Sequence, residues 1–306
     1  ASALGAEGRE FESRRSDQSI RKGCAARCNP FFTLAGDCPL PVTYRGLTPV
    51  PAFSRHGARA AARYDLLDAW RGLAMLWMTV FHFCFDLSHF GYWPQDFRAD
   101  PFWTVQRTLI VSLFLLCAGL GQAVAWQQGV GWGRFLRRWG RIVGCALLVT
   151  AGSYAMFPRS FIYFGVLHGM ALMLLVVRLT AGWGRWLWPA GLLAVASPWL
   201  AAWALEGPLA GWAGYFNGRA LNWLGWVSRK PFTEDYVPVF PWIGVMWWGM
   251  ACGQWLLARR APWIAGPLPR AAAPLAALGR YSLGYYMLHQ PIMIGALMLW
   301  GWLARP

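Results

Sequence analysis

Long apolar runs repeat along the chain from Asp65 to the C-terminus, and short polar or basic connections separate them. Each run is close to the 20 or so apolar residues that a helix needs to cross a bilayer. The pattern predicts about seven transmembrane helices, at residues 67–90, 103–126, 138–157, 161–179, 185–205, 237–257 and 281–303. We therefore expect an all-α protein, built as a polytopic membrane helix bundle.

The segment 1–62 differs from the rest, because it is rich in Arg, Gly and Pro and has no apolar run long enough to span a membrane. We expect a disordered basic leader here and a transmembrane domain over residues 63–306. Residues 8–18, GREFESRRSDQ, can be encoded by DNA that also reads as a transfer-RNA T-arm followed by CCA, and the first Met is Met75. We therefore expect the true translation start further along the chain, near Val42 or beyond.

The composition and the placement of charge fit a membrane protein. Of the 306 residues, 57% are hydrophobic and 13% are charged, against about 25% charged in soluble domains. The net charge of +15 would suit a nucleic-acid partner, but from residue 55 onward every second loop is basic, whereas the intervening loops carry acidic residues among their basic ones. The positive-inside rule then predicts a cytoplasmic N-terminus. Topology explains the charge, so we expect no nucleic-acid partner.

Ionisable groups are concentrated in the first predicted span. Such groups cost about 2.5–3.5 kcal/mol each inside a membrane helix and usually mark function. The span DAWRGLAMLWMTVFHFCFDLSHFG contains Asp68, Arg71, His82, Asp86 and His89. His82, Asp86 and His89 follow the i, i+4, i+7 spacing of one helix face, and Arg71 lies about three turns below His82 on that face. The first span is therefore the leading candidate for the chemistry.

This spacing suggests a general base. A histidine with a carboxylate one turn away is held in one tautomer and takes a proton from a hydroxyl or an amine, so His82 would be the base and Asp86 its orienting partner. Arg71 would meet the phosphates of an anionic donor or pair with Asp68. A structural polar cluster between helices explains the same spacing equally well.

Two further histidines lie inside later spans. His168 is found in FGVLHGMAL and His289 in YSLGYYMLHQP. One such residue is usually an interhelical hydrogen-bond donor, but with His82 they predict a shared tunnel. Gln290 and Pro291 predict a broken helix, whose free backbone groups are tolerated where they line a cavity.

Other features have structural explanations. Gly119 with Gly121, and Gly140 with Gly144, predict close helix contacts. Aromatic and amide side chains in the connection 206–236 suit a sugar or an interfacial segment equally well. Cys24, Cys28 and Cys38 match no standard zinc spacing, so no metal site is expected.

The first span also resembles a known family. DAWRGLAMLWMTVFHFCFDL is similar to the opening helix of bacterial proteins related to the catalytic domain of heparan-alpha-glucosaminide N-acetyltransferase. The resemblance continues through SLFLLCAGLGQ, FGVLHGMALMLL, VPVFPWIGVMWWGMACGQ and GRYSLGYYMLHQPIM, and so covers nearly all of the chain from Asp65 onward. The spacing of Arg71 and His82 is also similar to the Arg and His motif of the membrane acyltransferases that decorate surface polysaccharides.

The resemblance implies an enzyme that takes an acetyl group from cytoplasmic acetyl-CoA and delivers it to an acceptor across the membrane. In the lysosomal relative the acceptor is the amine of a terminal glucosamine. Arg71 and His82 match the Arg and His motif. Other residues lie within the sequence segments that resemble the family: Asp68, Asp86, His168, His289 and Gln290. The lysosomal enzyme has Asn at the position of His82 and its reactive His about a turn later, which keeps His89 among the candidates.

We therefore predict a multi-pass membrane N- or O-acetyltransferase in which His82 activates a sugar or glycan acceptor. The catalytic candidates are His82, Asp86, His89, His168 and His289. The residues expected to hold acetyl-CoA, the donor substrate, are Arg71, Arg138, Arg141 and Gln290. The alternative is a transporter or flippase with a proton-relay histidine cluster. A third interpretation is an inactive scaffold subunit that keeps only the fold.

Overall fold

The computed structural model describes residues 64–259, 264 and 266–304. The expectations for residues 1–62, including the basic leader, the three cysteines and the translation start, lie outside the described residues. The described part is mainly helical and forms no strand; Phe164 and Tyr236 make an isolated parallel bridge. The predicted all-α fold class is confirmed.

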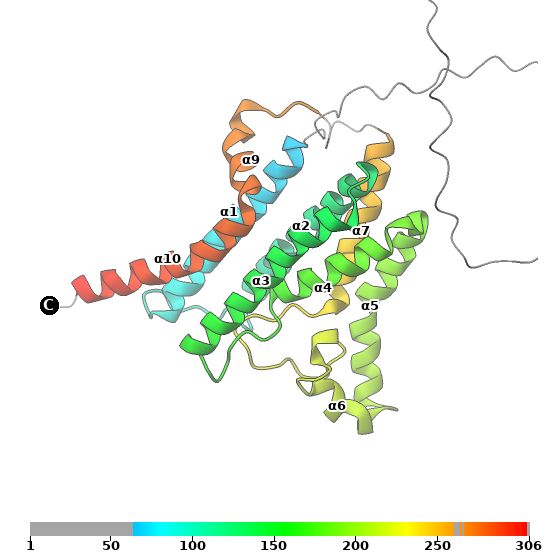
Figure 1. Ribbon diagram of the computed structural model, residues 1–306. Helices are drawn as coiled ribbons and strands as arrows, with labels where there is room; N and C mark the ends of the chain where they lie inside the picture. The colour runs from blue at the N-terminus through cyan, green and yellow to red at the C-terminus, as the bar shows by residue number, and fades with distance from the viewer. Residues whose placement is uncertain (1–63, 260–263, 265, 305–306) are drawn as a thin grey trace, which may run out of the picture. The chain divides into compact units, whose positions relative to one another are not determined.

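Figure 1 shows the order of the helices along the chain. The longer helices are α1 (Asp65–His89), α2 (Pro101–Gln127), α3 (Trp132–Met156), α4 (Val166–Leu179), α5 (Leu187–Glu206), α7 (Val239–Ala258) and α10 (Ser282–Leu303). The shorter ones are η1 (Ala181–Trp186), η2 (Ala210–Trp212), α6 (Ala213–Asn217), η3 (Asn222–Leu224), η4 (Arg270–Ala272) and α9 (Ala273–Arg280). Each predicted apolar run therefore contains a helix.

The fourth helix is shorter than its apolar run predicts. We expected it to begin near residue 161, but α4 begins at Val166. Residues before it make hydrogen bonds elsewhere: Ile162 N–H donates to Ser153 Oγ at 3.0 Å, and Ile162 O accepts from Thr150 Oγ1 at 2.8 Å. Gly165 then serves as the N-cap. Tertiary hydrogen bonds thus hold this stretch extended although its side chains are apolar.

The predicted break at Pro291 is wrong. Helix α10 runs from Ser282 to Leu303 with Pro291 inside it, and α5 likewise contains Pro198. A proline removes one backbone donor and crowds the preceding turn, yet neither helix ends there. Gln290 therefore lies on a continuous helix and not beside free backbone groups.

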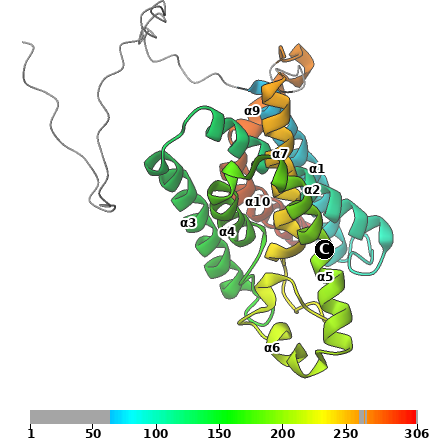
Figure 2. The same ribbon diagram turned by 90° about the vertical axis from the view of Figure 1, so that its right-hand side faces the viewer.

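The main core lies between α2, α4, α5 and α7. Its fully buried side chains include Leu115, Met173, Val177, Met246 and Met250. Figures 1 and 2 show α2 beside α7, and α3 beside α4. The contact of α2 with α7 joins segments that are more than one hundred residues apart in the sequence, whereas α3 and α4 are consecutive helices.

Glycine lets α2 and α7 approach closely. A Cβ added to Gly119 would lie 2.2 Å from the Met246 carbonyl oxygen, and one added to Gly249 would lie 2.4 Å from the Leu116 carbonyl oxygen. The predicted contact face at Gly119 is confirmed. The one predicted at Gly140 and Gly144 is wrong, because a Cβ at either position meets nothing within 4 Å.

Gly119→Val is expected to lower the free energy of unfolding by about 2 kcal/mol or more, since overpacking a close contact costs about 1–3 kcal/mol and the neighbour here is backbone. The measurement is thermal unfolding of the purified protein. Gly140→Val is the matched control and should leave the unfolding temperature nearly unchanged. Equal destabilisation by both variants would contradict a specific contact between α2 and α7.

The last two helices pack along α1. A Cβ on Gly279 of α9 would lie 1.8 Å from the Asp68 carbonyl oxygen, and one on Gly72 of α1 would lie 1.9 Å from the Leu275 carbonyl oxygen. Beyond α9, helix α10 continues along the second half of α1 and runs in the same direction (Figure 1). Residues in the second half of α1 therefore face the beginning of α10.

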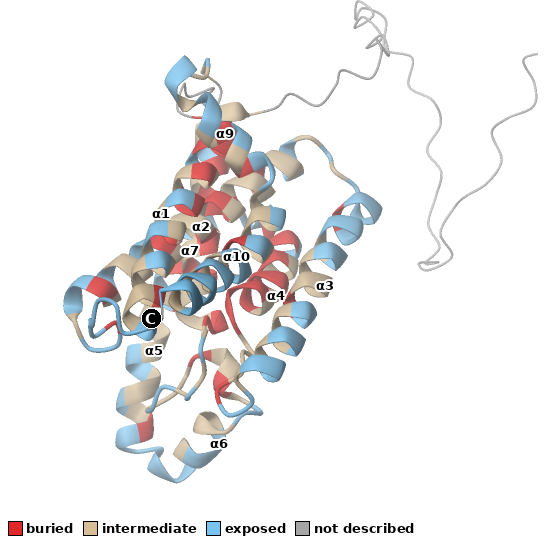
Figure 3. Cartoon of the chain, turned by 90° about the vertical axis from the view of Figure 1, so that its left-hand side faces the viewer, coloured by how far each residue is buried: buried red, intermediate tan, exposed pale blue. Residues whose placement is uncertain are grey.

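Large apolar side chains remain exposed on the outward faces of several helices. On α5, Leu192, Leu193, Trp199 and Trp203 are 60–70% exposed. Figure 3 shows many exposed residues on α3 and α10, and a mixture of exposed and partly buried residues on α5. Among the described helices, Pro101–Gln127 and Ala181–Glu206 have the length and hydropathy of a membrane span.

Candidate functional site

Helices α1 and α10 bring a set of polar side chains together inside the protein. Three contacts join them in order along both helices: Thr79 with Tyr285, His82 with His289, and Asp86 with Gln290. His82 and Asp86 are one turn apart on α1, and His289 and Gln290 are neighbours on α10. The parallel packing of the two helices therefore creates the site.

His289 is the most constrained histidine of this site. It is 7% exposed, and its Nδ1 lies 2.7 Å from the Tyr286 carbonyl oxygen. A carbonyl oxygen only accepts, so Nδ1 carries the proton and Nε2 presents a lone pair. Nε2 is buried and makes no hydrogen bond with any described residue. This arrangement is that of an oriented neutral base.

The rings around His289 fix its position. The His82 ring lies 5.3 Å away between centroids, with the planes inclined at 61°. Tyr285 stacks on His289 at 5.9 Å with an interplanar angle of 11°. Thr79 gives its one proton to the Met75 carbonyl oxygen at 2.8 Å, so Tyr285 donates the 2.7 Å hydrogen bond to Thr79. The Tyr285 hydroxyl therefore donates its proton to a residue of α1.

Asp86 does not hold His82 as the spacing predicted. Its Oδ1 accepts from Gln290 Nε2 at 2.7 Å, and among the described residues His82 makes no hydrogen bond. The expected His82–Asp86 bond is therefore replaced by one between helices, because α10 supplies a better-placed donor. Asp86 is 2% exposed, and its Oδ2 and the Gln290 Oε1 have no partner in the described part.

Three buried polar atoms of this site are thus left without a hydrogen bond. They are Asp86 Oδ2, His289 Nε2 and Gln290 Oε1. Buried polar groups in folded proteins are nearly always paired, and exceptions cluster where a ligand or water binds. We define Thr79, His82, Asp86, Tyr285, His289 and Gln290 as the α1–α10 site. Its open hydrogen-bonding positions make it a candidate site for a polar ligand.

His89 lies at the end of α1 and is exposed. Its ring stacks on Phe85 at 6.4 Å and meets Phe157 edge-on at 6.4 Å. The described residues give it no ring contact with His289. It lies beyond Asp86, at the rim of the α1–α10 site.

His168 is not brought together with the other two histidines. Its Nδ1 accepts from the Gly165 N–H at 3.3 Å, so its proton is on Nε2, which lies 2.9 Å from Thr150 Oγ1. Both ring nitrogens are therefore used in capping α4 and tying it to α3. Of the three histidines expected to converge, His82 and His289 are in ring contact, and His168 lies apart from them between α3 and α4.

Arg71 lies near the opposite end of α1. Its Nη1 is 2.9 Å from Asp68 Oδ1, which makes the ion pair that was one of two predicted roles. A Cβ on Gly121 of α2 would lie 2.4 Å from Arg71 Nη2. Gly121 thus leaves the space that the guanidinium occupies. Arg138 and Arg141, the other predicted donor-binding cations, are exposed on α3.

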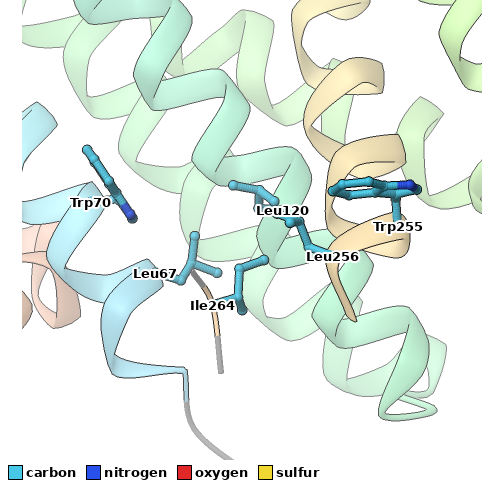
Figure 4. A pocket seen from close by; sticks show the side chains of 6 residues that line it. All are labelled: Leu67, Trp70, Leu120, Trp255, Leu256 and Ile264. Carbon is cyan, nitrogen blue, oxygen red and sulfur yellow. The ribbon is translucent and has the colours of Figure 1, made fainter. Parts of the chain in front are cut away.

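A pocket of about 350 Å³ opens between the ends of α1, α2 and α7 (Figure 4). Its lining residues are Leu67, Trp70, Leu120, Trp255, Leu256 and Ile264. The Arg259 guanidinium lies over the Trp255 ring at 4.2 Å from its centroid. The pocket is apolar inside and has cations near it, which suits a ligand with an apolar arm and an anionic end.

Asp235 is a structural residue that the sequence pattern did not reveal. Its Oδ2 accepts from the Val166 N–H at 2.7 Å and so caps α4 from a position 69 residues later in the chain. Burial raises the pKa of its carboxyl, while the hydrogen bond from Val166 and the charge of Arg107 act in the opposite direction. The N-terminal end of a helix favours such a carboxylate. Only the tertiary structure could place it there.

Tyr285 and Tyr286 were not among the site residues predicted from the sequence, although their spacing from His289 could have indicated them. They lie four and three residues before His289, which are the spacings of one helix face. Their contacts with His289 follow directly from this spacing.

A family model described as "Heparan-alpha-glucosaminide N-acetyltransferase, catalytic" matches residues 63–291. This range includes every residue of the α1–α10 site. No curated protein and no solved structure matches the chain.

Proposed function

The chain belongs to the heparan-alpha-glucosaminide N-acetyltransferase catalytic-domain family, and from this premise we propose that it moves an acetyl group from cytoplasmic acetyl-CoA to a sugar or glycan acceptor outside the cytoplasm. The observation that carries the proposal is the buried His289, whose Nε2 lone pair is oriented by the Tyr286 carbonyl and has no partner. A general base must present such a lone pair to its substrate.

The reaction follows from this orientation. Nε2 of His289 takes the proton from the acceptor hydroxyl or amine as that oxygen or nitrogen attacks the thioester carbonyl carbon. The carbon–sulfur bond then breaks, and the leaving thiolate of CoA takes the proton back from the imidazolium. The products are the acetylated acceptor and CoA thiol, so His289 ends as it began.

The other members of the α1–α10 site have supporting roles in this scheme. A ring N–H of His82 would stabilise the negative charge that develops on the carbonyl oxygen. Asp86 and Gln290, which hold each other, would bind hydroxyl or amine groups of the acceptor through their open atoms Oδ2 and Oε1. His89 at the rim and His168 in its capping position are candidates that the geometry favours less.

A membrane location explains the exposed apolar faces of α3, α5 and α10. We propose seven crossings, made by α1, α2, α3, α4 with the extended stretch before it, α5, α7, and α9 with α10. The basic connections then lie on the cytoplasmic side, together with the N-terminal end of α1. From the resemblance to bacterial proteins, we propose the bacterial inner membrane as the location.

The donor would enter from the cytoplasmic end. The apolar pocket at Leu67 and Trp255 suits the pantetheine arm, and Arg259 beside it suits the phosphates of CoA. Arg71 lies between this pocket and His82 on α1, while the exposed Arg138 and Arg141 would add positive potential at the same end. The acetyl group would reach the α1–α10 site along α1.

The proposal is tested with the full chain in sealed proteoliposomes of known orientation. Acetyl-CoA labelled in the acetyl group is supplied on one side and glucosamine-terminated oligosaccharide on the other. We expect labelled oligosaccharide only when the donor faces the N-terminal end of α1. Transport of the unlabelled oligosaccharide without any donor would instead support the transporter hypothesis. Absence of both reactions with a range of sugar acceptors would contradict the enzyme.

A further inference from the structure

Arg178 is a buried cation that the proposed reaction does not use. It lies in the last turn of α4 and is 7% exposed. Its Nη2 donates to the Val130 carbonyl oxygen, in the connection between α2 and α3. Its Nε and Nη1 are buried and make no hydrogen bond with any described residue. A guanidinium has five N–H donors, so most of its hydrogen-bonding capacity here is open.

Three aromatic rings surround this guanidinium. The centroids of Trp126, Trp132 and Phe135 lie 5.4, 5.6 and 5.8 Å from its central carbon. We call Arg178, Val130 and these three rings the Arg178 box. Ring faces attract the positive charge, but they are poor acceptors for its N–H groups.

The rings of the Arg178 box are held away from the cation. At Trp255, by comparison, the Arg259 guanidinium lies only 4.2 Å from the ring centroid, which is direct stacking. Distances of 5.4–5.8 Å are near the outer limit of the interaction, about 6 Å. Trp126 and Trp132 are 47% and 45% exposed, so the side of the box that they form lies at the protein surface.

The segments that form the box contain no acidic residue. Asp and Glu are absent from residues 121–141, which cover the end of α2 and the start of α3. They are also absent from residues 171–188, around the end of α4. These two segments contain five further cations, at Arg134, Arg137, Arg138, Arg141 and Arg185. The carbonyl groups at the end of α4 offset part of the charge. A full counter-ion has to come from outside these segments.

We propose that the Arg178 box binds a phosphate group at this end of the helices. A phosphate group suits a guanidinium well, because two parallel N–H···O bonds can join them. Half-exposed tryptophans mark the level of lipid headgroups in membrane proteins, so a phospholipid is one source, and a soluble phosphate is the other. The inference does not depend on the acetyltransferase proposal.

The test uses the full chain purified in a neutral detergent, and follows its thermal unfolding. The probes are a short-chain phosphatidylglycerol, inorganic phosphate, and sodium chloride at matched ionic strength. Binding at about 100 times the Kd should raise Tm by about 5 °C or more beyond the effect of chloride. A rise with the lipid alone identifies a headgroup site, and a rise with inorganic phosphate identifies a site for soluble phosphates.

Variants separate the Arg178 box from general attraction by the basic surface. Arg178→Gln should weaken phosphate binding at least tenfold, whereas the exposed Arg134→Gln at the same end should leave it within about twofold. If Arg178→Gln does not fold, Arg178→Lys replaces it, because one ammonium group cannot bind Val130 and a phosphate as the guanidinium does. Equal binding by wild type and the Arg178 variant, an equal loss in Arg134→Gln, or no rise beyond chloride would overturn the proposal.

Discussion

Replacing His289 with alanine is expected to lower the rate of acetyl transfer by about 100-fold or more, since a positioned general base contributes about 10²–10⁴-fold. The reason lies in the geometry of α10. The Tyr286 carbonyl fixes the proton on Nδ1 and leaves Nε2 as the only lone pair that the ring can offer. The measurement is the initial rate of label transfer in the proteoliposome assay.

Two matched variants complete the experiment. His168→Ala removes a ring whose two nitrogens already bind Gly165 and Thr150, so we expect a lower Tm and a rate per folded molecule within a few-fold of wild type. His89→Ala removes an exposed ring at the rim and should have a small effect on both. A His289→Ala rate close to wild type, or a loss confined to His82→Ala, would return the role of base to His82.

Breaking the bond between Asp86 and Gln290 is the second change with a large expected effect. Either Asp86→Ala or Gln290→Leu leaves the remaining partner buried without its hydrogen bond, which costs about 1–3 kcal/mol and more for a charged group. Because this bond joins α1 to α10, both variants should also misplace His289 relative to His82. We expect each to lower Tm by several degrees and the rate of acetyl transfer by tenfold or more.

A double-mutant cycle distinguishes this pair from two independent residues. The double variant Asp86→Ala with Gln290→Leu should be less damaging than the sum of the two single changes, with a coupling of about 1–3 kcal/mol. Asp86→Asn is the conservative control, because an amide oxygen can still accept from Gln290 Nε2. Strict additivity of the two single changes would show that the hydrogen bond contributes nothing to the site.

The sequence indicated which residues of α1 form a polar face, but not which residues of α10 they contact. On α1 the spacing of His82 and Asp86 correctly predicted a polar face, because residues one turn apart on a helix are neighbours whatever else the chain does. The same spacing suggested that Asp86 orients His82. Gln290, 204 residues later, forms the bond instead, and helical periodicity carries no information about a contact at that separation.

Two other differences between the sequence prediction and the structure also arise from contacts between helices. A proline was expected to break α10, but the loss of one backbone donor is too small to end a helix that packs along α1. Glycines at positions 119 and 140 look alike in the sequence. Only Gly119 meets another backbone, since α7 lies against that face of α2 and nothing lies against Gly140.

By itself, the sequence determined the helical fold class, the approximate extent of the longer helices and the family, because these depend on apolar periodicity and on residues close together in the chain. The tertiary structure alone decided that α10 runs beside α1, that His289 offers a free lone pair while His168 does not, and that Arg178 is enclosed by rings. The physical reason is that a buried polar group is satisfied by whichever donor or acceptor packing brings to it. That partner is set by the arrangement of helices, and for Asp86 it is more than two hundred residues away in the sequence.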